Sequence, residues 1–392
     1  MNPRFLLAST AAGLTVALAA HTLSACPTCP TNLGPSLSEQ VATADIAVIA
    51  TWKDGREADL EEGFAGSSTY EVSEVLRDKT GTVEQGAEVT LKRYRQAESG
   101  ETFLMLALTD EPVDWQPPLA ANDAVLKYLR NLPPADAPID DRLQYALAHL
   151  EHPELTIAND AMAEFAVAPY EDVAKLKEHI EPDKLRSWLT NPETDQTRIG
   201  FYSLLLGLVG NAGDAEFLRS RILEPTQDFR LGVDGMVAGF LLLTGAEGLD
   251  VIDREKLAPA DAPVSEVFAT MQGLQFMWTY EPGRIEAERL RASMRVLLDR
   301  PDMADLIITT LGRWEDWSVI DRLMELYDED EYAVPSIQRA IVRYFLVAER
   351  AKPSEEGGPK PESAKKAAEY LAQLRETDPE TVKQAERFFF LQ

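Results

Sequence analysis

Two cysteines near the start of the chain offer the residue types best suited to chemistry. Cys26 and Cys29 are separated by two residues, a spacing used by thiol–disulfide exchange and by metal sites. Pro27 and Pro30 follow them, and no strand precedes the pair as a redox fold requires. Two thiols without histidine partners are too few for a closed zinc site. The pattern favours lipidation of Cys26 or a local disulfide bond, with redox or metal chemistry as the alternative.

Two of the histidines form a second, weaker candidate. His149 and His152 lie three residues apart, so a helix would place them on one face as metal ligands. Pro153 follows directly and indicates that His152 already belongs to a loop. No cysteine lies nearby to complete a ligand set. We therefore expect surface histidines, no bound metal and no cofactor.

Tryptophans supply the candidate binding residues. Trp314 and Trp317 flank an expected turn, and Trp278 lies at the end of an earlier helical segment. Rings at helix–turn boundaries either line a groove for peptide or carbohydrate or pack into the core. We name Trp278, Trp314 and Trp317 as a candidate groove. We assign no catalytic residue, because the nucleophile pattern Gly-x-Ser-x-Gly is absent, and we expect no enzyme.

The charge balance narrows the class of partner. Asp and Glu number 66 against 38 Lys and Arg, which gives a net charge of -28. A polyphosphate partner would be repelled, so nucleic-acid binding through a basic surface is disfavoured. A protein partner at the cell envelope fits the composition better.

The first 25 residues read as a signal peptide. Arg4 is the only charge before Cys26, and residues 5–20 are an apolar run too short to span a bilayer as a helix. The residues Leu23, Ser24, Ala25 and Cys26 resemble a bacterial lipobox, which would anchor the mature protein by lipid at Cys26. They equally resemble an ordinary signal-peptidase site after Ala25. Both interpretations predict export to the periplasm or the cell surface.

Alternating apolar residues predict a small β domain over residues 26–118. A short helix is expected over 36–44, and strands over 46–50, 69–76, 87–94 and 102–108. Four or five strands joined by short turns indicate a small barrel or sandwich.

The order of these segments resembles the netrin-like or tissue-inhibitor-of-metalloproteinase OB-fold domain. The resemblance covers the N-terminal cysteine pair and the short helix. It continues through the strands at Ala44 to Val48 and Thr69 to Val72 and the segments Gly86 to Leu91 and Thr102 to Leu104. It implies an OB-like barrel. That family joins its N-terminal cysteines to downstream partners, which this chain lacks, so protease inhibition does not carry over.

Residues 135–350 carry the periodicity of stacked helices. The segment 197–218 predicts a helix–turn–helix unit. Its first helix is apolar around its whole circumference and is expected to be buried between neighbours, and the residues Gly210 to Gly213 end it before Asp214 caps the next helix. Arg198-Ile199-Gly200 recurs as Arg230-Leu231-Gly232, 32 residues further on, and Gly207 recurs as Gly239. This period resembles HEAT-type repeats and predicts an α-solenoid. Helices are expected over 140–150, 155–166, 170–180, 182–189, 196–209, 214–223, 229–243, 265–278, 285–298, 303–311, 318–326 and 336–347.

The remaining residues complete a multidomain α+β layout. Residues 351–361 read as a linker and residues 362–392 as a C-terminal helical pair. The two-part arrangement resembles that of secreted bacterial proteins, which implies a fold and a location only. We expect an exported, non-enzymatic binding or scaffold protein that holds a protein partner on its helical-repeat surface. The alternative is a thiol–disulfide or metal-dependent activity at Cys26 and Cys29.

Overall fold

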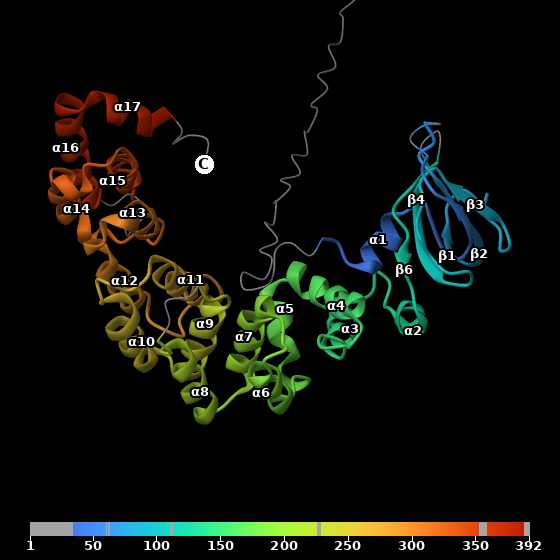
Figure 1. The fold of residues 1–392 in the computed structure, drawn as a ribbon. Helices are drawn as coiled ribbons and strands as arrows, with labels where there is room; N and C mark the ends of the chain where they lie inside the picture. The colour runs from blue at the N-terminus through green and yellow to red at the C-terminus, as the bar shows by residue number, and fades with distance from the viewer. Residues whose placement is uncertain are drawn as a thin grey trace, which may run out of the picture.

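The chain folds as an α+β protein, as the sequence predicts. A computed structural model describes residues 34–59, 61, 63–109, 113–225, 229–352 and 359–387. An antiparallel sheet comes first, and helices follow it to the end of the described chain (Figure 1). The predicted signal peptide, residues 1–25, lies outside these ranges. No helix in the described ranges is both long enough and apolar enough to cross a membrane.

Within the described residues, six strands form one sheet. They are β1 Ile46–Arg56, β2 Ser67–Asp78, β3 Glu88–Leu91, β4 Thr102–Leu108, β5 Asp114–Trp115 and β6 Leu119–Ala120. The hydrogen-bonded order is β3-β2-β1-β4-β5, with β6 also paired to β4, and all pairs are antiparallel. Because β3 and β5 stand at opposite ends of this order, the sheet is open, and the small β-barrel predicted from the sequence is wrong in this respect.

β1 occupies the centre of the sheet because its sequence is apolar on both faces. Ile46, Val48 and Ala50 lie in a core that belongs to the sheet alone. Ile49 pairs with Leu104 of β4, and both lie in a second core on the opposite face. Successive side chains of a strand point to opposite faces, so one apolar run serves both cores.

Helices cover the second face of the sheet and join it to the rest of the molecule. They are α1 Leu37–Thr43, α2 Asp123–Asn131, α3 Ile139–Leu147 and α4 Leu155–Val167. Ser36 begins α1 through a capping box with Glu39. The second core continues into these helices through Leu37, Val125, Tyr128 and Ile157. We call this region, where α1, α2, α3 and α4 meet, the junction.

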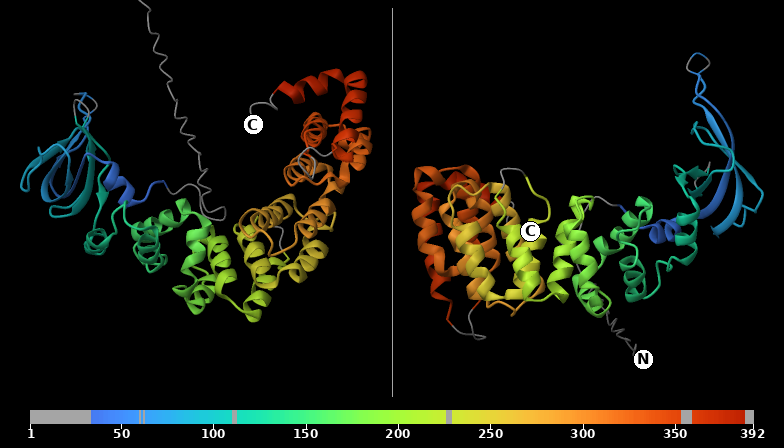
Figure 2. Two further views of the ribbon diagram at one scale, coloured as in Figure 1. Left: turned by 180° about the vertical axis from the view of Figure 1, so that it is seen from behind. Right: turned by 60° about the horizontal axis from the view of Figure 1, so that its bottom comes forward.

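The remaining helices follow in chain order. They are α5 Tyr170–Lys175, α6 Pro182–Thr190, α7 Ile199–Val209, α8 Ala212–Ile222, α9 Val233–Thr244, α10 Ala246–Ile252, α11 Val264–Tyr280, α12 Ala287–Arg295, α13 Ala304–Arg313, α14 Ile320–Tyr327, α15 Pro335–Ala348, α16 Glu362–Thr377 and α17 Pro379–Arg387. Figures 1 and 2 show them as a curved row that extends from the sheet. In Figure 1, α9, α11, α13 and α15 lie toward the inner side of the curve, and α8, α10 and α14 lie toward the outer side.

The recurring glycines are the points where α7 and α9 touch. A Cβ added to Gly200 would lie 3.0 Å from the Cα of Gly232, and one added to Gly207 would overlap Gly239. The absence of side chains lets the two backbones approach this closely. The sequence repeat therefore marks a helix–helix contact. α7 is buried from Ile199 through Gly207, which confirms the predicted buried helix.

Candidate functional site

The cysteine pair Cys26 and Cys29 lies outside the described residues. Its predicted lipidation, its disulfide bond and the alternative redox or metal role stay predictions.

The three tryptophans of the candidate groove take part in two separate ring contacts. Trp278 and Trp314 stack on each other, with ring centroids 4.3 Å apart and planes 10° apart. Arg291 donates to the backbone oxygen of Trp314 at 2.9 Å and lies over the ring of Trp278. Trp317 instead packs edge-to-face against Tyr344. Trp314 is buried and the other two are half-buried, so each ring already has a partner inside the protein. The groove stays a prediction.

The solvent-facing side of α11 is distinctive because it carries no charge. Its exposed side chains are Val264, Phe268, Gln272 and Thr279. The only charged residue of this helix, Glu266, is buried. In a chain where 27% of the residues are charged, a solvent-facing helix would ordinarily carry several.

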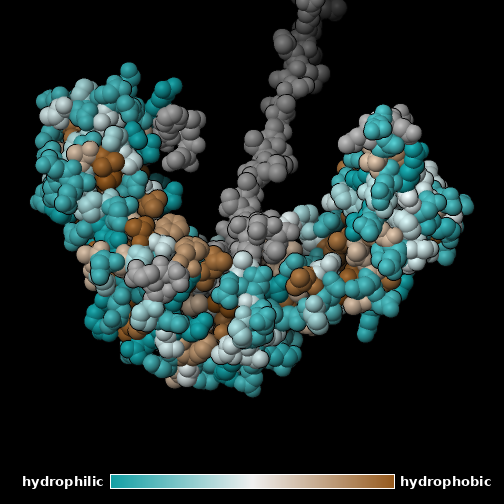
Figure 3. All heavy atoms as spheres, in the orientation of Figure 1, coloured by the Kyte–Doolittle hydropathy of each residue, from teal (hydrophilic) through white to brown (hydrophobic). Residues whose placement is uncertain are grey.

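Apolar side chains extend this uncharged face toward the neighbouring helices. The exposed set comprises Phe229, Leu231, Val264, Phe268 and Leu306, which we call the apolar edge. Phe229 is 71% exposed and Val264 is 48% exposed. Figure 3 shows apolar surface over α9, α11 and α13. Contiguous exposed apolar surface of this kind marks interaction sites in soluble proteins.

Three polar contacts hold the apolar edge together. Arg230, between the two exposed residues that precede α9, donates to Glu266 of α11 at 2.9 and 2.6 Å. Gln275 of α11 donates to the hydroxyl of Thr310 on α13 at 3.2 Å. Lys256 also donates to Glu266, at 2.6 Å. Burial raises the pKa of Glu266, but the hydrogen bonds from Arg230 and Lys256 outweigh it and bring the pKa below its ordinary value. The carboxylate therefore stays ionised and fixes the loop before α9 against α11.

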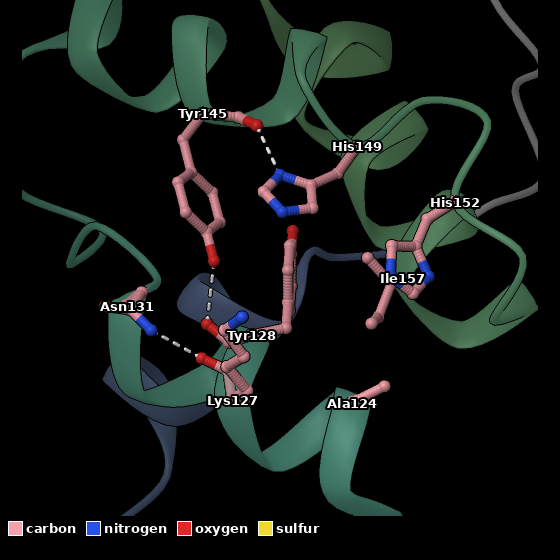
Figure 4. Close-up of a pocket in the computed structure, with 8 residues that line it drawn as sticks. All are labelled: Ala124, Lys127, Tyr128, Asn131, Tyr145, His149, His152 and Ile157. Atoms are coloured by element: carbon pink, nitrogen blue, oxygen red, sulfur yellow. Dashed lines mark hydrogen bonds between the residues drawn. The ribbon is translucent and has the colours of Figure 1, made fainter.

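A cavity of about 530 Å³ opens at the junction (Figure 4). Its walls include the rings of Tyr128, Tyr145 and His149. The ring centroids of the two tyrosines are 5.1 Å apart, and the ring centroid of His149 lies 4.5 Å from that of Tyr145. Lys127 and Asn131 line the cavity from α2, and His152 lines it beyond the end of α3. We call this space the junction cavity.

Hydrogen bonds fix how both histidines face the junction cavity. The backbone oxygen of Tyr145 lies 2.7 Å from His149 Nδ1. A carbonyl only accepts, so Nδ1 carries the proton and Nε2 of the neutral ring is an acceptor. The backbone N–H of Glu154 donates to His152 Nδ1 at 3.0 Å, so the Nε2 of His152 carries its proton. The two rings therefore offer one acceptor and one donor.

This geometry does not favour the metal site considered from sequence. Both histidines lie in the turn after α3 and not on one helix face, and the protonated Nε2 of His152 has no lone pair for a metal. Across the described ranges, no group of three His, Cys, Asp or Glu side chains is arranged to hold a metal ion.

Two buried carboxylates of α4 accept hydrogen bonds from the other helices of the junction. Asp160 accepts the N–H of Leu37 at 2.5 Å and the hydroxyl of Tyr128 at 2.7 Å. Glu164 accepts the hydroxyl of Ser38 at 2.8 Å and Arg142 Nε at 2.9 Å. Burial raises the pKa of Asp160 to about 6, although both hydrogen bonds act against that rise.

Comparison of the chain with protein-family models, with curated proteins and with solved structures finds no match to any of them.

Proposed function

We propose that this chain is an exported, non-enzymatic binding or scaffold protein that holds a protein partner on its helical surface. The proposal includes a HEAT-like solenoid of paired helices behind a netrin-like sheet domain. It is supported by the curved order of the helices and by the recurring glycine contact between α7 and α9. Helical repeats present long surfaces that suit protein partners.

The apolar edge is the observation that carries this proposal. Exposed apolar side chains are unfavourable in water, and a partner that covers them lowers the free energy of the system. The uncharged face of α11 continues the same surface, so a partner would not have to remove water from charged groups there. We infer that the partner presents apolar side chains to this face.

Site-specific photo-crosslinking tests the proposal and does not require the partner to be identified first. A photoreactive residue at position 268 or 306, in the full chain expressed in a bacterial host, should give discrete adducts with another protein. The matched control places the same residue at the exposed Glu247 of α10, a helix on the outer side of the row (Figure 1).

Substitution separates specific adducts from random capture. Leu231→Glu in the crosslinking chain should abolish the adducts formed at position 268, because it places a charge in the apolar contact. Adducts of equal strength from position 247, or adducts that survive Leu231→Glu, would refute the proposal.

Location is a separate part of the proposal. We propose cleavage before Cys26, or lipidation at it, with the mature protein in the periplasm or at the cell surface. The intact mass of the mature protein distinguishes an acylated Cys26 from a free N-terminus. An uncleaved chain in the cytoplasm would contradict export.

A further inference from the structure

The junction cavity has the dimensions and walls of a small-molecule site. Its volume of about 530 Å³ falls within the range of ordinary ligand pockets. The half-buried ring of Tyr145 supplies a flat apolar wall, the buried ring of Tyr128 packs against it, and Ile157 closes the space from α4. Flat aromatic walls favour a planar ring, because offset stacking adds to the burial of apolar area.

The polar atoms of the tyrosines are already used inside the protein. The hydroxyl of Tyr128 donates to Asp160, and the hydroxyl of Tyr145 donates to the backbone oxygen of Tyr128 at 2.9 Å. These bonds fix both rings in place. The groups left to meet a ligand are therefore Lys127 Nζ, His152 Nε2–H, His149 Nε2 and Asn131 Oδ1, none of which has a hydrogen-bond partner within the described chain.

These groups select the charge of the ligand. Lys127 forms no ion pair with any described residue, and no lining residue of the cavity is Asp or Glu. The carboxylate of Glu154, which follows His152 closely in the chain, accepts a hydrogen bond from Asn122 at 2.6 Å. An ammonium and an imidazole N–H together favour a carboxylate, whereas the bare Nε2 of His149 requires a donor.

We propose that the junction cavity binds a planar aromatic carboxylate that also carries a hydrogen-bond donor, of which the hydroxybenzoates are the simplest examples. The carboxylate meets Lys127 and His152, the ring lies along Tyr145, and the hydroxyl donates to His149. Because the walls come from α2 on the sheet side and from α3 and α4 on the helix side, the ligand bridges the two parts of the molecule.

Titration of the full chain with a panel of small aromatic acids tests this site. Para- and meta-hydroxybenzoate are the probes, followed by the perturbation of tyrosine and histidine resonances or by calorimetry. Benzoate lacks the donor, and para-hydroxybenzamide lacks the charge. We expect at least one hydroxybenzoate to bind saturably, and both comparators to bind about tenfold more weakly or worse.

Protein variants assign the binding to named atoms. Lys127→Gln and His152→Phe should each weaken the hydroxybenzoate about tenfold, since each removes one donor to the carboxylate. Lys92→Gln removes an exposed lysine of the sheet region and is the matched control, with unchanged affinity expected. Thermal unfolding of each variant confirms that the fold is intact.

Three outcomes would overturn the proposal. They are the absence of saturable binding by any probe at millimolar concentration, equal affinity for the hydroxybenzoate and its amide, and equal weakening by Lys127→Gln and Lys92→Gln. The comparison of the different ligands uses the unsubstituted protein. It therefore still tests the proposal if a variant fails to fold.

Discussion

Gly207 of α7 and Gly239 of α9 face each other so closely that a Cβ on Gly207 would lie 2.7 Å from the carbonyl oxygen of Gly239. Neither backbone has room for a methyl group at this crossing. Two glycines that recur at a fixed interval in the sequence thus determine the spacing of two buried helices.

Gly239→Ala should destabilise the protein by about 2–3 kcal/mol, because the added methyl group would overlap the backbone of Ser203 and force α7 and α9 apart. Urea or thermal unfolding measures the loss. Gly312→Ala is the matched control: a Cβ there would lie 3.4 Å from the ring and 4.0 Å from the Cα of Tyr344, which are ordinary contact distances. Its effect should stay within about 1 kcal/mol, in the stabilising direction expected for alanine in a helix. Equal losses in the two variants would contradict the close crossing.

Asp160→Asn should remove a pH dependence of stability. Burial raises the pKa of Asp160 from 3.8 to about 6 in the folded protein. Between these values the folded chain keeps a proton that the unfolded chain has released, so the contribution of this group falls as the pH rises. Nearby Glu39 and Glu164 favour the protonated form further. The full difference corresponds to about 3 kcal/mol above pH 6.

The measurement is the free energy of unfolding of both proteins at pH 4 and pH 7.5. Asparagine has no carboxylate to ionise, so the stability of the variant relative to wild type should rise between these two values. Groups common to both proteins cancel in the comparison. Asp160→Leu, which leaves the buried N–H of Leu37 without its acceptor, should instead destabilise at both values. A constant difference for Asp160→Asn would show that Asp160 has an ordinary pKa.

Glu266→Gln should destabilise the protein by about 3 kcal/mol at neutral pH, because two half-buried cationic partners, Arg230 and Lys256, lose their buried counter-charge. The pKa of Glu266 is lowered, so its stabilisation is present above the unfolded pKa and is lost as the pH falls through the folded value. Glu216→Gln breaks an exposed pair with Arg219 and should change stability by less than about 0.5 kcal/mol. Similar losses in both variants would argue against a buried ion pair.

Replacing Cys26 and Cys29 together by serine separates the two functional hypotheses. If the protein acts as a binding module, crosslinking at position 268 should be unchanged once the mature chain is exported. If its activity resides in the thiols, disulfide exchange or metal binding should disappear in the variant. Loss of the adducts with an intact fold and normal export would count against the binding proposal.

Local patterns of apolar residues in the sequence predict the strands and helices well where those residues are buried. Continuous apolar runs predict β1 and β4, alternation predicts β2, and the apolar circumference of 199–209 predicts the burial of α7. The helix α2 is not among the predicted helices, because Pro133 and Pro134 follow it closely and a proline pair is typical of a loop. Its signal is nevertheless present, since Asn122 caps it and Val125 and Tyr128 share one buried face.

The junction could not be predicted from the sequence, because it depends on contacts between distant segments. Leu37 and Asp160 are separated by 123 positions, and no local pattern links a backbone N–H to a carboxylate so far away. The junction cavity is hidden for the same reason. The two histidines are visible in the sequence, but the ring orientations that make one an acceptor and the other a donor depend on the turn after α3.

The bond between Leu37 and Asp160 also sets an order of events during synthesis. A ribosome makes the sheet and its leading helix well before it makes α4, so the first amide groups of that helix must wait in water for their acceptor. The packing of α1 against α4 is therefore a late step of folding. A chain truncated before residue 160 should be cleaved more readily by proteases at α1.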